Sequence, residues 1–232
     1  MEELVLIENL SKNYGEYQVL KNVNLTIQSG KIIGLLGQNG AGKTTLIKLM
    51  NDLLKISSGK ILIKGHSLGV ETKKIVSYLP EKTYLDKSKN CYQTIKFFKE
   101  FYENFDTKKA ETLLKDLNID LSQKISKMSK GMQEKVQLVL VMSRKADLYI
   151  LDEPLGGVDP ATRDYILDTI LTNFNENASI IISTHLISDI ERILDEVIFL
   201  HKGEILLHEN ADMLREKENK SIDEIFREKF RC

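Results

Sequence analysis

A glycine-rich segment, GQNGAGKTT at residues 37–45, constrains the fold of this chain more than any other feature. It matches the pattern G-x-x-x-x-G-K-[ST] and follows KIIGLLG, a short apolar run typical of a strand buried on both faces. After it, apolar residues recur with the spacing of an amphipathic helix: Leu46, Leu49, Met50, Leu53 and Leu54. A strand, a glycine loop and a helix in this order predict a phosphate-binding unit, whose free N–H groups and helix N-terminus hold the anion.

The residue types in this loop indicate a nucleotide together with Mg²⁺. Gly40 and Gly42 let the backbone approach the phosphates. Lys43 would reach the β- and γ-phosphates, and the Thr44 hydroxyl would bind Mg²⁺. The alternative is a glycine turn with a solvated lysine, which the flanking strand and helix patterns disfavour.

Acidic and imidazole side chains follow two further apolar runs. Asp152 and Glu153 end a predicted strand in LYILDEP, and His185 ends another in SIIISTH. The carboxyl ends of parallel strands meet at one sheet edge, where the ligands of open α/β sheets bind. There Asp152 would hold Mg²⁺, Glu153 would act as general base on the attacking water, and His185 would bridge that water and the γ-phosphate. Alternatively, the carboxylates only cap a turn or a helix, and the histidine is packed or solvated.

The hydrophobic pattern predicts one α/β domain of the P-loop NTPase class, with a mainly parallel core sheet, an N-terminal antiparallel β subdomain and an inserted α-helical subdomain. The opening residues alternate apolar and polar around a Tyr-Gly turn, as antiparallel strands with one solvated face do. A second hairpin is expected to turn at Lys202-Gly203. Within the single domain 1–232 we expect a catalytic core with the β subdomain at 1–82 and 145–210, the helical subdomain at 83–144, and a charged helical tail at 211–232.

Composition argues against several other classes of protein. Lys and Arg (33) nearly balance Asp and Glu (34), so no basic excess predicts a nucleic-acid partner. Cys91 and Cys232 match no metal or redox spacing, which favours free thiols in a reducing compartment. The apolar runs fall short of the roughly 20 residues of a spanning helix, and the first residues lack a basic region before an apolar one. The predicted location is therefore the cytoplasm.

Seven features, in order, make the chain resemble the nucleotide-binding subunit of an ATP-binding cassette (ABC) transporter over about residues 3–210. They are the aromatic Tyr14, the phosphate loop, Glu81 after SYLP, and the segments MSKGMQ, LYILDEP, GGVDP and STH. The resemblance implies ATP and Mg²⁺ as cofactors, with adenine on Tyr14.

The resemblance also assigns roles to individual residues. Those implied at the metal are Thr44, Glu81 and Asp152. Those implied in catalysis are Glu153 and His185. Those implied in binding the phosphates of ATP are Gly37, Gln38, Asn39, Gly40, Ala41, Gly42, Lys43, Thr44 and Thr45.

A partner subunit is implied as well, because two cassettes of this family pack head to tail and each completes the nucleotide site of the other. Ser129, Lys130 and Gly131 of the MSKGMQ segment would contact the partner's ATP. Asp159 of GGVDP would communicate across the interface. From the residues alone, the alternative is that Ser129 is simply the N-cap of an ordinary helix.

Two positions depart from the usual residues of the family. Where the usual segment is Leu-Ser-Gly-Gly-Gln, Lys130 replaces the first glycine and Met132 the glutamine. Glu81 stands where most relatives carry a glutamine that lends an oxygen to Mg²⁺. We expect the charge of Lys130 to replace part of the lost polar contact, and the Glu81 carboxylate to make the Mg²⁺ concentration more decisive.

The predicted function is Mg²⁺-dependent ATP hydrolysis that drives export through a separate transmembrane permease. The two departures, with the lack of fused membrane segments, resemble the bacterial exporter branch that includes bacitracin-type and sodium-extrusion systems. The subunit would act as a homodimer or paired cassette, peripheral on the inner face of the cell membrane. The alternatives are the ATPase subunit of an ABC importer and a non-transport ABC ATPase.

Aromatic residues crowd into one stretch of the expected helical subdomain: Tyr92, Phe97, Phe98, Phe101, Tyr102 and Phe105. Spacing of i, i+4 and i+8 favours the core of a small helical unit. The alternative is a groove that receives a short helix from the membrane partner.

Overall fold

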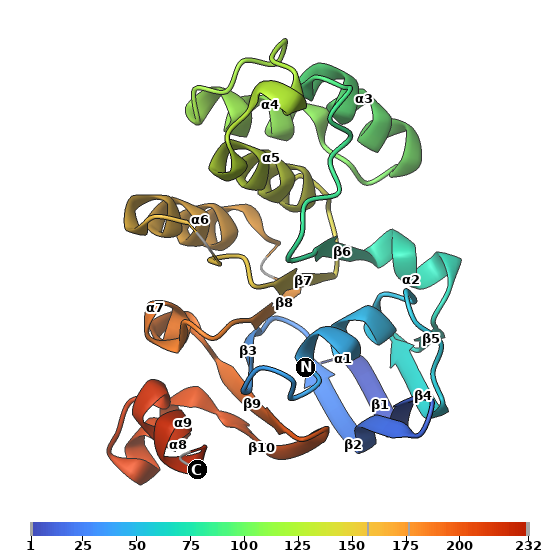
Figure 1. Cartoon of the computed structure of the whole chain (residues 1–232), viewed down its shortest axis with the longest axis vertical. Coiled ribbons are helices and arrows are strands. Elements are labelled where there is room, and N and C mark those ends of the chain that lie inside the picture. The colour runs from blue at the N-terminus through green and yellow to red at the C-terminus, as the bar shows by residue number, and fades with distance from the viewer. Residues whose placement is uncertain (1, 157, 176, 231–232) are drawn as a thin grey trace.

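The structure, a computed structural model, describes residues 2–156, 158–175 and 177–230 (Figure 1). Gly157 of the GGVDP segment and the predicted free thiol Cys232 lie outside these residues. Cys91 is a buried free thiol, and burial, with the nearby charge of Asp120, raises its pKa to about 11. Within the described residues, no helix is both long enough and apolar enough to cross a bilayer.

A mainly parallel sheet forms the centre of the described structure. In sheet order its strands are β10 (Glu204–Asn210), β9 (Glu196–His201), β3 (Ile32–Leu36), β8 (Ser179–Ser183), β7 (Leu148–Asp152) and β6 (Val76–Leu79). Of these described strands, β10 alone runs antiparallel to its neighbour, and His201 pairs with Glu204 across the predicted hairpin turn. Every residue of β3, β7 and β8 is buried because both faces of the sheet are covered.

A second, antiparallel sheet packs beside the first. Its strands, in sheet order, are β2 (Tyr17–Gln28), β1 (Glu3–Tyr14), β4 (Ser58–Ile63) and β5 (His66–Ser67). Tyr14 pairs with Tyr17 across a two-residue turn in which Gly15 has φ +59°, a conformation that favours glycine. Helix α1 (Lys43–Met50) lies between the two sheets, and its apolar side chains share one core with both (Figure 1).

Helix α1 is shorter than its apolar stripe predicts. It ends at Met50, Asp52 adopts φ +55°, and Leu53 lies in the following turn with 57% of its surface exposed. The prediction that Leu53 and Leu54 continue the helix is therefore wrong. The chain reverses at this point toward β4, and the Asn51 side chain donates a hydrogen bond to the Ile47 carbonyl in the last turn.

A helical region occupies one end of the molecule and has its own apolar core (Figure 1). Its elements are α3 (Cys91–Phe101), α4 (Thr107–Asp116), the 3₁₀ turn η1 (Ile125–Lys127) and α5 (Lys130–Met142). The aromatic cluster, which extends from α3 to Phe105, has a buried face and an exposed face. Phe98 and Phe105 are buried, with ring centroids 5.6 Å apart, whereas Phe97 and Phe101 are 43% and 67% exposed. The core interpretation therefore fits only one face.

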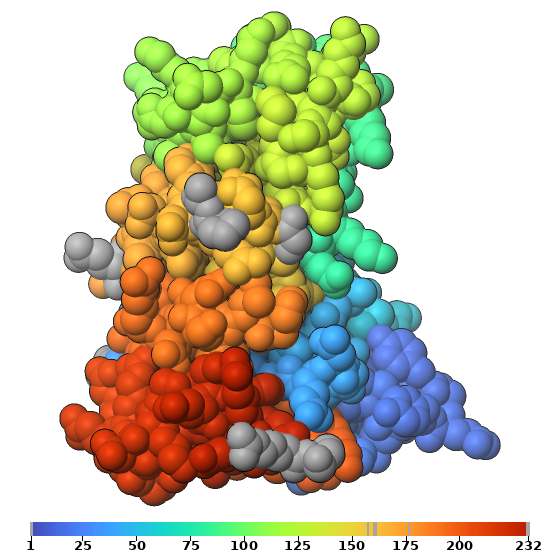
Figure 2. Space-filling view, turned by 60° about the vertical axis from the view of Figure 1, so that its left-hand side comes forward, coloured from blue at the N-terminus to red at the C-terminus, as the bar shows by residue number. Residues whose placement is uncertain are grey.

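The remaining helices are α2 (Val70–Ile75), α6 (Pro160–Asn173), α7 (Ile187–Ile190), the 3₁₀ turn η2 (Glu191–Ile193), α8 (Ala211–Glu218) and α9 (Ile222–Lys229). The apolar residues of α6, α7, α8 and α9 pack on the face of the central sheet opposite α1. The charged tail is thus helical, as its composition predicts. Figure 2 shows the helical region and the C-terminal helices at opposite ends of the molecule.

Candidate functional site

The glycine loop joins β3 to α1 with a backbone that depends on glycine at defined positions. Gly40 and Gly42 have φ +82° and +109°, and Gly42 is the N-cap of α1. A Cβ at Gly42 would lie 2.8 Å from the Leu20 side chain, and a Cβ at Gly37 would lie 2.4 Å from the Leu200 carbonyl oxygen. Side chains are therefore excluded where the loop packs on its neighbours, and the N–H groups at the start of α1 remain available to an anion.

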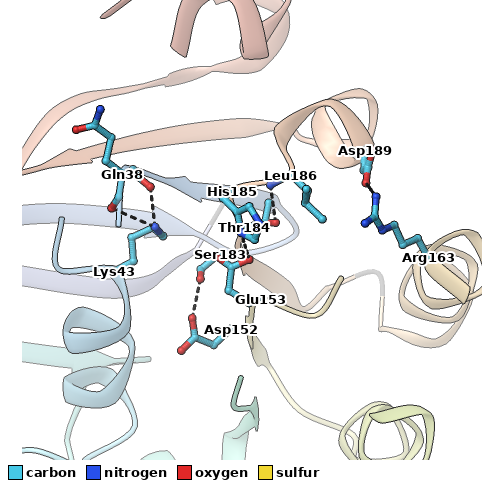
Figure 3. Close-up of polar contacts among 11 residues, drawn as sticks. Gln38, Lys43, Asp152, Glu153, Arg163, Ser183, Thr184, His185, Leu186 and Asp189 are labelled. Atoms are coloured by element: carbon cyan, nitrogen blue, oxygen red, sulfur yellow. Dashed lines mark hydrogen bonds and ion pairs between the residues drawn. The ribbon is translucent and has the colours of Figure 1, made fainter. Parts of the chain in front are cut away.

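Lys43 is held inside the loop by main-chain oxygens. Its Nζ donates to the Gly37 carbonyl at 2.6 Å and to the Gln38 carbonyl at 3.4 Å, and the residue is 7% exposed (Figure 3). Burial lowers the pKa of Lys43, while the charges of Glu153 and Asp152 oppose the shift. The loop therefore places one nearly buried amine beside the helix N-terminus, next to two carboxylates.

Asp152 ends β7 with one oxygen satisfied and one unsatisfied. The Ser183 hydroxyl, at the end of the neighbouring β8, donates to Oδ1 at 2.7 Å (Figure 3). Among the described residues, the buried Oδ2 has no hydrogen-bond partner. Burial raises the pKa of Asp152, and the hydroxyls of Ser183 and Thr44 oppose this. A buried carboxylate oxygen without a donor has the chemistry of a ligand for a hard cation.

Glu153 and His185 form a pair at the same edge of the sheet. Glu153 Oε2 lies 2.9 Å from His185 Nδ1, and the Glu153 N–H donates to the Ser183 carbonyl at 2.9 Å (Figure 3). Glu153 adopts φ +53°, a conformation that is uncommon for a residue with a Cβ and that clusters at functional sites. The parallel strands β7 and β8 thus bring together the two side chains predicted for catalysis.

Lys43, Glu153 and His185 line a cleft of about 950 Å³, whereas Asp152 and Gly37 do not line it. Predicted site residues that line it are Gln38, Asn39, Gly40, Ala41, Gly42, Lys43, Thr44, Thr45, Glu81, Lys130, Glu153 and His185. Tyr14 does not line the cleft: its ring is 49% exposed and lies 5.0 Å from Lys12 Nζ. The adenine contact of Tyr14 stays a prediction.

Some residues of the cleft were missed from the sequence: Tyr17, Val19, Lys82, Thr83, Glu134 and Gly156. Tyr17 and Val19 reach it because β2 passes the glycine loop, a neighbourhood that only the folded chain creates. The other four residues had a sequence signal: Lys82 and Thr83 follow Glu81, Glu134 follows the MSKGMQ segment, and Gly156 begins GGVDP.

The residues predicted to meet a partner subunit lie at helix starts. Ser129 is the N-cap of α5, and its hydroxyl accepts from the Met132 N–H at 3.2 Å. Asp159 is the N-cap of α6 and accepts from both the N–H and the hydroxyl of Thr162, which lowers the pKa of Asp159. The capping role of Ser129 is confirmed. The contacts of Ser129, Lys130, Gly131 and Asp159 with a partner stay predictions.

Similarity to known proteins covers most of the chain. Residues 20–156 match the family model described as ABC transporter. The chain is 32% identical to the ABC transporter ATP-binding protein YtrB of Bacillus subtilis, over 92% of this chain and 74% of that protein. It is 34% identical to an uncharacterized ABC transporter ATP-binding protein of Methanocaldococcus jannaschii, over 88% of this chain and 76% of that one. The lantibiotic transport ATP-binding protein SrtF of Streptococcus pyogenes is 30% identical over 98% of this chain and its whole length.

Solved structures show the same fold. An ATP binding subunit of an ABC transporter aligns with a TM-score of 0.88 and 29% identity, over 97% of this chain and 98% of its own. A dimeric ATP-binding cassette bound to ADP and Pi aligns with a TM-score of 0.78 and 22% identity, a level that supports the fold alone. The predicted α/β fold with a mainly parallel sheet is confirmed.

Proposed function

This chain belongs to the ABC transporter family as an ATP-binding, ATP-hydrolysing subunit, and from that premise we propose that it powers export through a separate transmembrane partner. The observation that carries the proposal is the cleft in which the phosphate loop faces the Glu153–His185 pair. Phosphoryl transfer to water needs an anion cradle, a cation at the β- and γ-phosphates and a group that orients the water. The residues of this cleft match those needs.

The triphosphate would bind across the start of α1. The first N–H groups of α1 would face an anion at the helix N-terminus, where the helix dipole also favours negative charge. Lys43 would exchange its carbonyl contacts for phosphate oxygens, which are stronger acceptors because they are charged.

Water would attack the γ-phosphate from the side of Glu153. The carboxylate accepts the proton of the water while the new oxygen–phosphorus bond forms and the bond to the β–γ bridging oxygen breaks, which releases ADP and phosphate. The Nδ1–H of His185 donates to Glu153 and fixes that carboxylate, and in the imidazolium form the Nε2–H would also donate to a phosphate oxygen. The pair thus divides the work between proton acceptance and positioning.

Mg²⁺ fits the oxygen atoms at this site. The unsatisfied Oδ2 of Asp152, the Thr44 hydroxyl and the Glu81 carboxylate are hard donors of the kind that Mg²⁺ prefers. The described residues hold no group of three or more His, Cys, Asp or Glu side chains placed to bind a metal ion, so phosphate oxygens and water would complete the ion's shell. When bound, Mg²⁺ supplies charge that neutralises the triphosphate.

A second cassette would close the cleft. Ser129 opens the 13-residue helix α5, and a Cβ at Gly131 would meet nothing within 4 Å, so this helix start is accessible to a partner's phosphate. We place Ser129, Lys130 and Gly131 on the ATP of the second copy, with Asp159 at the same interface. Lys130 pairs weakly with Glu134 at 3.4 Å and is 78% exposed, so its ammonium is free to reorient.

The transmembrane partner would dock in a second groove of about 640 Å³, between the helical region and the core. The exposed side chains of Leu53 and Phe101 line it, and Lys48, Lys73 and Lys82 contribute cations. SrtF is a lantibiotic transport protein, and a 28% identical relative in Bacillus subtilis, LnrL, is a linearmycin resistance protein. These relatives favour export over import. In that role, this subunit would lie on the inner face of the membrane.

Replacement of Glu153 by Gln tests the proposal. The amide keeps the shape of the side chain but cannot accept the proton, so ATP turnover should fall by ~10² to 10⁴ while nucleotide binding persists. Lys43→Ala is the contrasting variant, because it should weaken nucleotide binding itself. A Glu153→Gln protein that keeps most of its ATPase activity would remove Glu153 from the role of general base.

A further inference from the structure

A residue at the end of α9 is bonded to the phosphate loop. The Gln38 side-chain amide donates to the main-chain carbonyl of Phe230 at 3.1 Å, across 192 residues of sequence. Figure 3 shows the Gln38 side chain directed away from Lys43, while its main-chain oxygen faces the lysine. That same oxygen accepts from the Ala41 N–H at 3.1 Å. Gln38 therefore connects α9 to the turn that shapes the loop.

The Phe230 carbonyl is held in place by a buried aromatic cluster. The Phe230 ring is centred 4.4 Å from Phe226, 5.2 Å from His201 and 5.8 Å from Phe199, and the residue is 7% exposed. Phe199 pairs with Leu36, the last residue of β3 before the loop. The anchor of the carbonyl thus packs on the strand beside the one that leads into the loop.

The β9–β10 turn provides a second attachment. The Gly203 N–H donates to the Ala41 carbonyl at 3.0 Å, and the Gly203 carbonyl accepts from the Lys21 N–H at 2.8 Å. A Cβ at Gly203 would lie 2.2 Å from the Val19 carbonyl oxygen, so the turn fits only as glycine. This attachment holds Ala41, whereas the contact with Phe230 holds Gln38.

We propose that Phe230 is a positioning residue for nucleotide binding, whose carbonyl holds the Gln38 side chain and thereby the phosphate loop in its anion-binding shape. The inference rests on the proposed function, since it needs a nucleotide at this loop. A loop fixed in its bound shape loses less freedom on binding, which raises affinity. Displacement of α9 would lower the affinity without touching the nucleotide.

Two single variants and their combination test this. Gln38→Met keeps the length of the side chain and removes the donor, and Phe230→Ala removes the ring that anchors the carbonyl. Each should weaken ADP binding about two- to tenfold, the range expected for one hydrogen bond. The double variant should bind ADP no more weakly than Phe230→Ala alone, because both changes break the same contact. Phe230→Leu should restore most of the affinity.

The measurement is a calorimetric titration of the full chain with ADP. Leu114→Ala is the matched control, since Leu114 is fully buried in α4 and packs in the separate core of the helical region; its ADP affinity should equal that of the wild type. Unchanged affinity in Gln38→Met, or additive effects in the double variant, would overturn the proposal. Gln38 is exposed, so this variant folds even where Phe230→Ala loosens α9.

The titration distinguishes a failure of the proposed function from a failure of the role assigned to Phe230. If the wild-type chain does not bind ADP, the proposed function fails. If the wild type binds and Lys43→Ala does not, while Gln38→Met binds as the wild type does, the proposed function stands and the role of Phe230 is refuted.

Discussion

Arg144 should be one of the most costly side chains to remove, although it lies outside the catalytic cleft. It follows Ser143, the C-cap of α5, and is 4% exposed. Its guanidinium donates to the carbonyls of Val76, Lys73 and Lys74 and to Asn104 Oδ1. Arg144 thus ties the helical region to the end of α2 and the start of β6.

The change Arg144→Met keeps most of the buried volume and removes every donor. The guanidinium also lies 3.8 Å from the centre of the Tyr102 ring, a contact worth about 1–2 kcal/mol when desolvated. Loss of the donor to the buried Val76 carbonyl costs about 1–3 kcal/mol. Burial of the guanidinium is itself unfavourable, and it lowers the pKa of Arg144. The methionine variant avoids this cost, which offsets part of the lost stability. The net loss of unfolding free energy should be about 2–4 kcal/mol.

Thermal unfolding followed by circular dichroism measures this loss. For a chain of this size, 2–4 kcal/mol corresponds to a fall in Tm of roughly 5–15 °C. Arg192→Met is the matched control, because Arg192 is exposed, and its Tm should stay close to that of the wild type. If Arg144→Met unfolds within about 1 °C of the wild type, Arg144 does not join the two parts as argued.

Three further changes probe the site and its interface. Lys130→Gly should weaken ATP-driven dimerisation, measured by sedimentation in the Glu153→Gln background, and unchanged dimer affinity would refute the role of the Lys130 charge. Glu81→Gln removes negative charge beside the triphosphate, so the Mg²⁺ dependence of ATP turnover should change; an identical Mg²⁺ titration would argue against Glu81 at the metal. Asp159→Ala should lower the urea midpoint at pH 7. The pKa of Asp159 is lowered on folding, so its contribution is present above its ordinary value of about 3.9 and is lost as pH falls through the folded pKa. The two midpoints should converge in strong acid, and a difference that persists there would contradict the ionic part of this cap.

Local patterns located the chemistry of the site because that chemistry lies at strand ends. The glycine loop, Asp152, Glu153 and His185 each follow an apolar run, and parallel pairing of β3, β7 and β8 brings them to one edge. Short apolar strands joined by helical connections form parallel sheets, and a parallel sheet brings the carboxyl ends of its strands to one edge.

Where prediction failed, the deciding interaction was not local. The stripe through Leu53 and Leu54 has helical spacing, yet the left-handed Asp52 ends the turn before them. Phe97 and Phe101 are spaced four apart just as Phe98 and Tyr102 are, so periodicity alone cannot say which pair packs toward the core of the helical region. Packing against α4 and α5 decides it.

Long-range polar contacts could not be predicted from the sequence. The acceptors of Arg144 lie 40 to 71 residues away, and the carbonyl that holds Gln38 lies 192 residues away. These acceptors are mostly main-chain oxygens, whose positions no residue type encodes. Tyr17 likewise reaches the cleft only because β2 folds beside the loop.

The central claim is that each subunit completes the nucleotide site of its neighbour, and mixing two inactive variants tests it most directly. Lys43→Ala disables the phosphate loop, and Ser129→Asp keeps an N-cap oxygen on α5 but sets a carboxylate toward the partner's phosphate. Each protein alone should be inactive. An equimolar mixture should recover about a quarter of the wild-type ATP turnover, because half of random pairs are mixed and each has one intact site of two. If mixed pairs form and turnover stays at the level of the separate variants, each chain completes its own site and the account is wrong.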